Sequence, residues 1–246
     1  MKMHRILTAV SLAGILSVVQ SPVVGMAADE PPAPKRAATN AYIEQTALDQ
    51  LKRMSETLGA AKALTFRTSN TVEVPAKTGQ YITLFANSEI ALERPNKLRA
   101  KVTGEVPNFD FTYDGSTIAA FAPNNNVYSI SKAPDTVDAM LPFIEKASGI
   151  RFASADLLFS DPYAVLTKGL SSAVVVGSDT VQGVPCEHLA FRAPGTKWEI
   201  WIESGARALP RRLVITYTNV TNFPRSLVEF SHWNSRWIPA IIDRPL

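Results

Sequence analysis

The stretch from Val181 to Tyr217 constrains the fold of this chain most, because it has the pattern of three adjacent β-strands. Each run is rich in Val, Ile, Phe, Trp and Tyr, the residues that favour strands. Clusters of Gly, Pro and Ser separate one run from the next. The expected strands are Val184–Arg192, Lys197–Glu203 and Leu209–Thr218.

The middle run alternates strictly between two faces, since successive side chains of a strand point to opposite sides. One face carries only apolar residues, and the other carries two carboxylates with one large aromatic between them. The first set is Trp198, Ile200 and Ile202, and the second is Glu199, Trp201 and Glu203. This pattern is typical of an antiparallel sheet with one buried and one wetter face.

Six further strand signals occur upstream and are joined by turn sequences, among them Asp114-Gly115, a strong hairpin signal. Two later strands are expected from Ala173 and over Leu227–Trp233. The upstream runs are Leu64–Val74, Gln80–Leu92, Lys97–Thr103, Phe109–Tyr113, Ser116–Ala122 and Asn126–Ser131. Their succession predicts an antiparallel meander.

Three segments have helical periodicity instead, namely Tyr42–Leu58, Pro134–Ala147 and Ser154–Lys168. Gly59 is expected to close the first, and Ser154 to cap the third, which Asp161-Pro162 interrupts. The order is helix, strands, helices, strands, without βαβ alternation. The sequence therefore predicts an α+β fold in which helices gather against one large antiparallel sheet.

A sheet of about eleven strands is too wide to stay flat and should curl into an incomplete barrel. Helices would then cover its concave side, and inward side chains would surround a space suited to apolar ligands. The alternative is that the same side chains fill a solid core, because both arrangements need apolar residues at strand spacing. The candidate ligand-binding residues are Phe109, Phe111, Phe121, Phe143, Leu157, Leu158, Phe159, Trp198 and Ile200.

The N-terminus has the pattern of a secretory signal peptide. Lys2 and Arg5 precede an apolar run from Ile6 to Val19, and small residues follow up to Ala28. The run is shorter than the ~20 residues of a membrane span. We therefore expect a signal peptide over residues 1–27, a flexible leader over 28–41, and one domain over 42–246 that is soluble in the periplasm.

The charge and the reactive residues exclude several function classes. The formal charge is +3, and loss of Lys2 and Arg5 with the signal would leave about +1, so nucleic acid is not an expected partner. Cys186 is the single cysteine, and His188 follows on the same strand face. The pair could form a nucleophile and base or half a metal site. A buried cysteine beside a hydrogen-bonded histidine is the simpler interpretation, and no cofactor, metal or catalytic motif is expected.

Three segments also resemble a known family. They are GVPCEHLAF (Gly183–Phe191), WEIWIE (Trp198–Glu203) and LPRRLVITY (Leu209–Tyr217). With ALERPNKLRA and SADLLFSDPYAVL upstream, they are similar to an uncharacterised family of predicted bacterial periplasmic proteins grouped with LolA/LolB-like lipoprotein carriers. The resemblance covers roughly Leu48 to Trp233. It implies a half-barrel with a helical lid and, as in several LolA-like proteins, a hydrophobic cavity that holds acyl chains.

Three functions follow as hypotheses. The first is a periplasmic carrier or binding protein for a lipid-like ligand, with Asp161-Pro162 letting the helical cover move as a lid. The second is an interaction or regulatory module that binds an envelope protein partner. The third is an enzyme, which ranks last because the sequence contains no catalytic constellation.

Overall fold

The computed structural model describes residues 41–148 and 154–234 of the chain. The predicted signal peptide and residues 28–40 of the predicted leader lie outside the described residues. The same holds for residues 235–246 of the predicted domain. Within the described part, none of the helices combines the length and apolar character that crossing a membrane requires.

The described strands form one sheet, in the order β1-β8-β9-β10-β11-β12-β2-β3-β4-β5-β6-β7. Their bounds are β1 Tyr42–Ile43, β2 Ala63–Pro75, β3 Tyr81–Glu93, β4 Lys97–Gly104, β5 Phe109–Tyr113, β6 Thr117–Ala122, β7 Val127–Lys132, β8 Ser172–Val181, β9 Val184–Ala193, β10 Thr196–Glu203, β11 Pro210–Tyr217 and β12 Arg225–Asn234. The sheet is open, with β1 and β7 at its edges. The predicted large antiparallel sheet is confirmed.

One pair departs from the predicted meander. Tyr42 and Ile43 begin the predicted first helix but instead form β1, which pairs in parallel with β8. The chain then turns, and Glu44 accepts the first backbone hydrogen bonds of α1 through its carbonyl oxygen. Because β1 is only two residues long, it covers little of the edge of β8.

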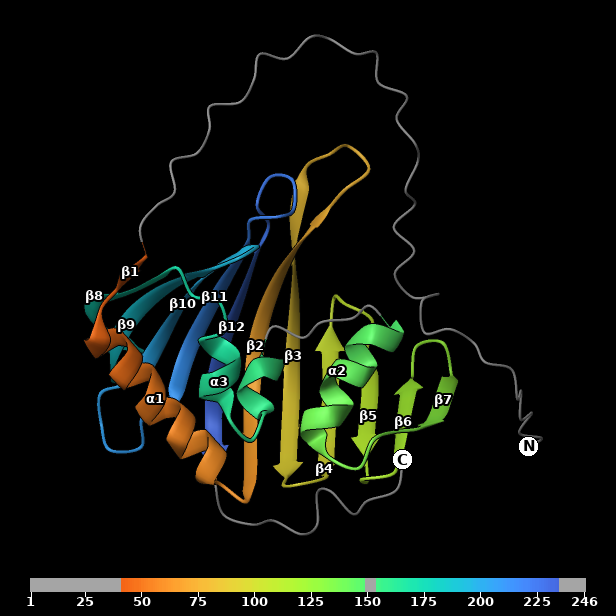
Figure 1. Cartoon of the computed structure of the whole chain (residues 1–246). Helices are drawn as coiled ribbons and strands as arrows, with labels where there is room; N and C mark the ends of the chain where they lie inside the picture. The colour runs from red at the N-terminus through yellow and green to blue at the C-terminus, as the bar shows by residue number, and fades with distance from the viewer. Residues whose placement is uncertain (1–40, 149–153, 235–246) are drawn as a thin grey trace, which may run out of the picture.

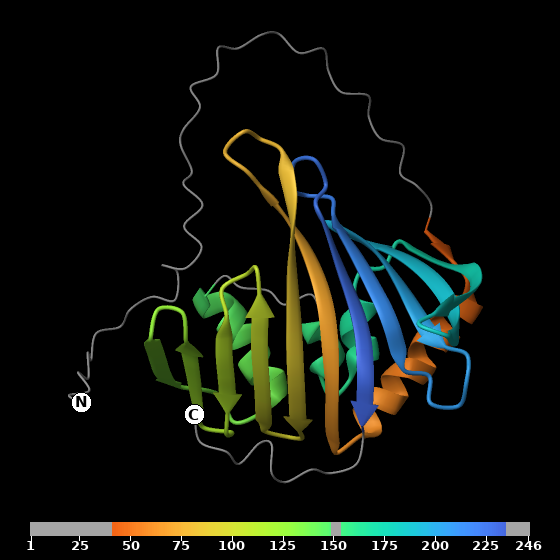
Figure 2. The same ribbon diagram turned by 180° about the vertical axis from the view of Figure 1, so that it is seen from behind.

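The helical elements are α1 Gln45–Ala60, α2 Val137–Ser148, the short 3₁₀ helix η2 Ala155–Leu158 and α3 Pro162–Leu166. They all lie on one side of the sheet, and the other side carries none of the described helices (Figures 1 and 2). We call the helix-bearing side the inner face and the other the outer face. In Figure 1, α1 crosses the strands near β8 to β10, α2 lies over β4 and β5, and η2 and α3 lie between.

Two predicted helix boundaries are wrong for local reasons. Ser154–Lys168 is two short pieces, and Ser154 makes no capping bond. The cap is Asp161, whose side chain accepts a hydrogen bond from the Ala164 N–H while Pro162 occupies the first turn of α3. Gly59 does not end α1, which continues to Ala60. A side chain at Gly59 would lie 2.6 Å from the Ser160 carbonyl oxygen, so glycine allows a close approach of these two segments.

One main core joins the sheet to the helical elements on its inner face. The apolar stripe of α1 is fully buried in it, since Ala47, Leu51, Met54 and Leu58 are inaccessible to solvent. Ile200 and Ile202 of β10 belong to the same cluster. The apolar face predicted for the Lys197–Glu203 strand, observed as β10, is therefore the inner face.

Candidate functional site

The strand pairings decide which of the candidate ligand-binding residues share a surface. Paired residues in neighbouring strands point to the same face. Tyr113 of β5 lies in the main core, and Phe111 and Phe109 follow it at steps of two on the inner face. Trp198 and Ile200 of β10 also lie on the inner face, but in the opposite half of the strand order.

Four of the candidates are buried within the main core. Leu157 and Leu158 of η2 and Trp198 and Ile200 of β10 all belong to it, with at most 8% of their surface exposed. The Trp198 ring stacks on the Phe191 ring with centroids 4.0 Å apart. Protein side chains therefore surround these four residues on the α1 side of the molecule.

The remaining inner-face candidates are only partly covered. Phe111 packs against the edge of the core, and Phe109 is half-buried. On the helical side, Phe159 is half-buried between η2 and α3, and Phe143 of α2 keeps 40% of its surface exposed. These side chains lie toward the α2 side of the molecule.

Phe121 does not lie with the others. It pairs with Asp110 of β5, whereas Phe111 pairs with Ala120. Phe121 therefore points to the outer face, opposite to Phe109 and Phe111. Because each strand alternates, a one-residue difference in position moves an aromatic side chain from one side of the sheet to the other.

Several inner residues were missed by the sequence analysis. Ile90 of β3 lies on the inner face, since it pairs with Phe66, yet it remains partly exposed. Leu141 and Ile144 of α2 and Tyr163 of α3 are likewise half-buried against the edge of the core. The alternation within Gln80–Leu92 could have revealed Ile90. Apolar side chains of the central sheet and of two helices thus remain incompletely covered.

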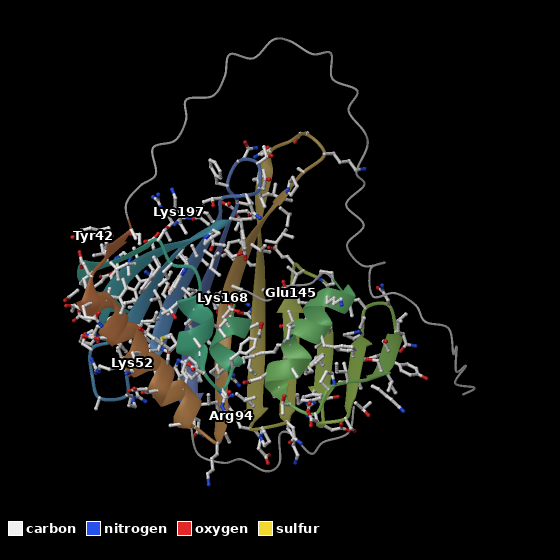
Figure 3. All side chains as sticks on the ribbon, viewed as in Figure 1. Tyr42, Lys52, Arg94, Glu145, Lys168 and Lys197 are labelled. Carbon is white, nitrogen blue, oxygen red and sulfur yellow. The ribbon has the colours of Figure 1, made fainter. Side chains whose placement is uncertain are left out.

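We call the segment formed by η2 and α3 the cover. Polar contacts attach it to the turn between β3 and β4. Arg94 lies at this end of the sheet (Figure 3). Its guanidinium donates to the carbonyl oxygens of Leu158 (2.8 Å), Phe159 (2.7 Å) and Leu58 (3.5 Å). Burial lowers the pKa of Arg94, partly offset by the negative charge of Asp138.

Asp138 of α2 makes the second attachment of this cover. Its carboxylate accepts from the Ser160 N–H at 2.9 Å and also from the Ser160 hydroxyl. The Val137 N–H donates to the Pro95 carbonyl oxygen in the same turn as Arg94. The attached residues of the cover, Leu158, Phe159 and Ser160, lie at the junction between η2 and α3, next to Asp161-Pro162.

The outer face carries a separate polar and aromatic cluster around Trp201. The His188 ring stacks on the Trp201 ring at 3.9 Å, and His188 Nε2 lies 3.0 Å from Glu199 Oε2. Trp201 donates its indole N–H to Asp179 at 3.2 Å, and the Arg212 guanidinium lies over the indole ring at 5.4 Å. Each of these polar groups has a partner within the sheet, which is typical of a structural network.

Cys186 is fully buried in a small core cluster beside Trp201. Its thiol donates to the Val184 carbonyl oxygen at 3.3 Å, and His188 is bonded to Glu199 instead. The interpretation as a buried cysteine beside a hydrogen-bonded histidine is confirmed. No group of three or more His, Cys, Asp or Glu side chains among the described residues is placed to hold a metal ion.

We expect the thiol of Cys186 to resist alkylation in the folded protein, because burial raises its pKa and excludes the reagent. N-ethylmaleimide at pH 8 should modify the native chain at least about a hundredfold more slowly than the urea-unfolded chain. Since Cys186 is the only cysteine, intact-mass spectrometry follows the reaction directly. Equal rates in the two states would contradict the assignment.

A comparison with protein families identifies relatives of the chain. The model of a family described as predicted periplasmic protein, DUF2092, matches residues 47–239. No curated protein sequence matches the chain significantly. The family match confirms the periplasmic location that the sequence predicts.

Solved structures with related folds differ widely in sequence. Lipoprotein LppX of Mycobacterium tuberculosis is 12% identical with a TM-score of 0.51, covering 81% of this chain and 100% of its own. LprF of Mycobacterium bovis is 14% identical with a TM-score of 0.47, covering 82% and 98%. A LolA superfamily protein of Nitrosomonas europaea is 10% identical with a TM-score of 0.36, covering 82% and 96%. At these identities, the likeness to LppX concerns the fold alone.

Proposed function

Since the chain belongs to the DUF2092 family of predicted periplasmic proteins, we propose that it binds or carries a lipid-like hydrophobic ligand in the cell envelope. In this proposal the sheet curves as an incomplete barrel, the helices cover its concave side, and the ligand lies between the two layers. Removal of the signal peptide 1–27 would leave a leader of residues 28–41 followed by one domain of residues 42–246. The protein has no catalytic role.

One observation carries the proposal. Apolar side chains from the central inner face and from the covering helices pack against the core but remain partly exposed; they are Ile90, Phe111, Leu141, Ile144, Tyr163 and Leu166. A filled core would bury such side chains at the centre of a sheet completely. An acyl chain placed there would cover them. Each buried CH₂ contributes ~0.8 kcal/mol, so about ten carbons would contribute roughly 8 kcal/mol before ordering costs are subtracted.

The hydrogen bonds that hold the cover would leave α3 free to open for a ligand that must enter and leave. Arg94 and Asp138 hold the segment between η2 and α3 through hydrogen bonds to Phe159 and Ser160. Asp161-Pro162 then separates η2 from α3, and proline removes a backbone donor at the junction. We propose that α3 can move about this junction as a lid while η2 stays with the core.

Native mass spectrometry of protein purified from the periplasm without detergent tests the proposal. We expect additional mass that leaves on activation and that solvent extraction identifies as an acyl species. The protein mass should correspond to a chain beginning at Ala28 or Asp29. A ligand-free protein that also takes up no added acyl compound would contradict the proposal.

A second candidate, a module that binds an envelope protein, is supported by the edge strand β7. Val127, Tyr128 and Ile130 are exposed there, with Ile130 63% exposed, and no described strand pairs with the outer edge. An extended segment of a partner could add to this edge. Replacing Ile130 with Pro should abolish such a complex in a pull-down from envelope extract while leaving ligand uptake unchanged.

A further inference from the structure

The inner face of the central strands contains a polar patch among apolar residues. Thr68 and Asn70 of β2, Ser88 of β3 and Ser226 of β12 lie next to one another through the strand pairings. Thr68 faces Ser88 directly, and Asn70 lies one step further along the same face. Thr68, Ser88 and Ser226 are each at most 8% exposed. Polar groups buried in this way need hydrogen-bond partners.

Asn70 lacks one such partner. Its Nδ2 donates to the Ser88 hydroxyl oxygen at 3.2 Å. Its Oδ1 is buried and accepts no hydrogen bond. A buried acceptor without a donor costs free energy that a well-packed apolar side chain at the same place would avoid. Ser88, which holds the Asn70 amide, is the next inner-face residue of β3 before the incompletely covered Ile90. This unmet acceptor therefore indicates a place where a bound molecule supplies the donor.

The inner face around Asn70 carries no charged side chain on β2, β3 or β12, which argues against a charged group on that molecule. Every second residue of β2 from Leu64 to Val74, of β3 from Ile82 to Leu92 and of β12 from Ser226 to Phe230 lies on the inner face. None of these residues is charged. The charged residues of the same strands, such as Arg67 and Glu89, pair on the outer face. A carboxylate or phosphate bound here would meet no counter-charge on these strands, which makes its burial costly.

We infer that Asn70 and Ser88 bind the uncharged head group of an amphiphilic ligand, with Asn70 Oδ1 accepting a hydrogen bond from a hydroxyl or amide N–H. The ligand class is then a neutral hydroxyl-bearing or amide-bearing lipid, whose acyl chain lies along Ile90 and Phe111. This assignment rests on the proposed function and adds the identity of the head group to it.

Three probes with the same acyl chain test the inference, namely 1-monolauroylglycerol, methyl laurate and laurate. The first offers hydroxyl donors, the second is neutral without a donor, and the third is charged. Isothermal titration of the full mature protein should show monolauroylglycerol binding about tenfold more tightly than either of the others, the effect of one hydrogen bond.

Asn70→Leu should lower the affinity for monolauroylglycerol about tenfold and leave that for methyl laurate unchanged. Ser88→Ala, which deletes only the hydroxyl that holds the Asn70 amide, should cost about threefold. Asn87→Leu makes the same change on the outer face of the neighbouring strand, where Asn87 is exposed, and should change neither affinity.

The possible failures are distinguishable. If the unaltered protein binds all three probes equally, or prefers laurate, the head-group assignment is wrong and the proposed function stands. An Asn70→Leu protein that keeps the full preference for monolauroylglycerol also overturns the assignment. If the unaltered protein binds none of the probes, the proposed function fails as well.

Discussion

Arg94→Met is expected to destabilise the domain by about 3 kcal/mol, the loss of charge-assisted hydrogen bonds to buried carbonyl oxygens. Arg94 holds the end of α1 and the end of η2 through the carbonyl oxygens of Leu58, Leu158 and Phe159. Methionine keeps the length of the side chain but leaves those oxygens without a donor. The melting temperature should fall by roughly 6 to 12 °C, measured by circular dichroism.

Arg67→Met is the matched control for Arg94. Arg67 forms an exposed ion pair with Glu89 at 3.1 Å, with more than half of each side chain accessible, and such pairs contribute at most about 1 kcal/mol. Hydrogen exchange gives a local readout, because amides of η2 and α3 should exchange faster in Arg94→Met alone. Similar stability losses in both variants would contradict the role of Arg94.

Phe111→Glu is expected to abolish uptake of an acyl ligand, a loss of about a hundredfold or more, because the carboxylate lies on the apolar wall that the chain would contact. Phe111 is only partly buried, so the variant should still fold. Leu158 and Trp198 are unsuitable for this test, since both lie within the core and a charge there would unfold the domain. Fluorescence titration with a pyrene-labelled acyl probe measures the loss.

Phe121→Glu provides a close control for Phe111→Glu. Phe121 is the same residue type on the next strand, is also half-buried, and points to the outer face. It should retain uptake of the probe. If both variants lose uptake equally, or neither does, the ligand does not occupy the inner face near β5.

The sequence predicted the strands well because their side chains alternate and their turns carry Gly, Pro or Asp. The Phe109–Tyr113 strand matches to the residue, and Asp114 closes its hairpin by accepting from the Ser116 and Thr117 N–H groups. The same hairpin register separates Phe111 from Phe121. The predicted set of ligand-binding residues nevertheless contained both of them, although the register of the hairpin places them on opposite faces.

Contacts between distant segments could not be predicted from local pattern. Arg94 appears in the sequence only as part of a turn. Its guanidinium nevertheless donates hydrogen bonds to carbonyl oxygens of residues 36, 64 and 65 positions away in the sequence. Gly59 has the pattern of a helix end, but its role depends on the approach of Ser160. Asn70 resembles any polar residue of a strand until the pairings place it on the inner face.

Photolabelling with an acyl probe that carries a diazirine on its chain tests the central claim most directly. After irradiation and digestion, mass spectrometry should find the label on peptides containing Ile90, Phe111 or Tyr163, which are partly buried against the core. An excess of unlabelled ligand should remove it. Label confined to the outer-face peptides around Trp201, or to the β7 edge at Ile130, would contradict the account.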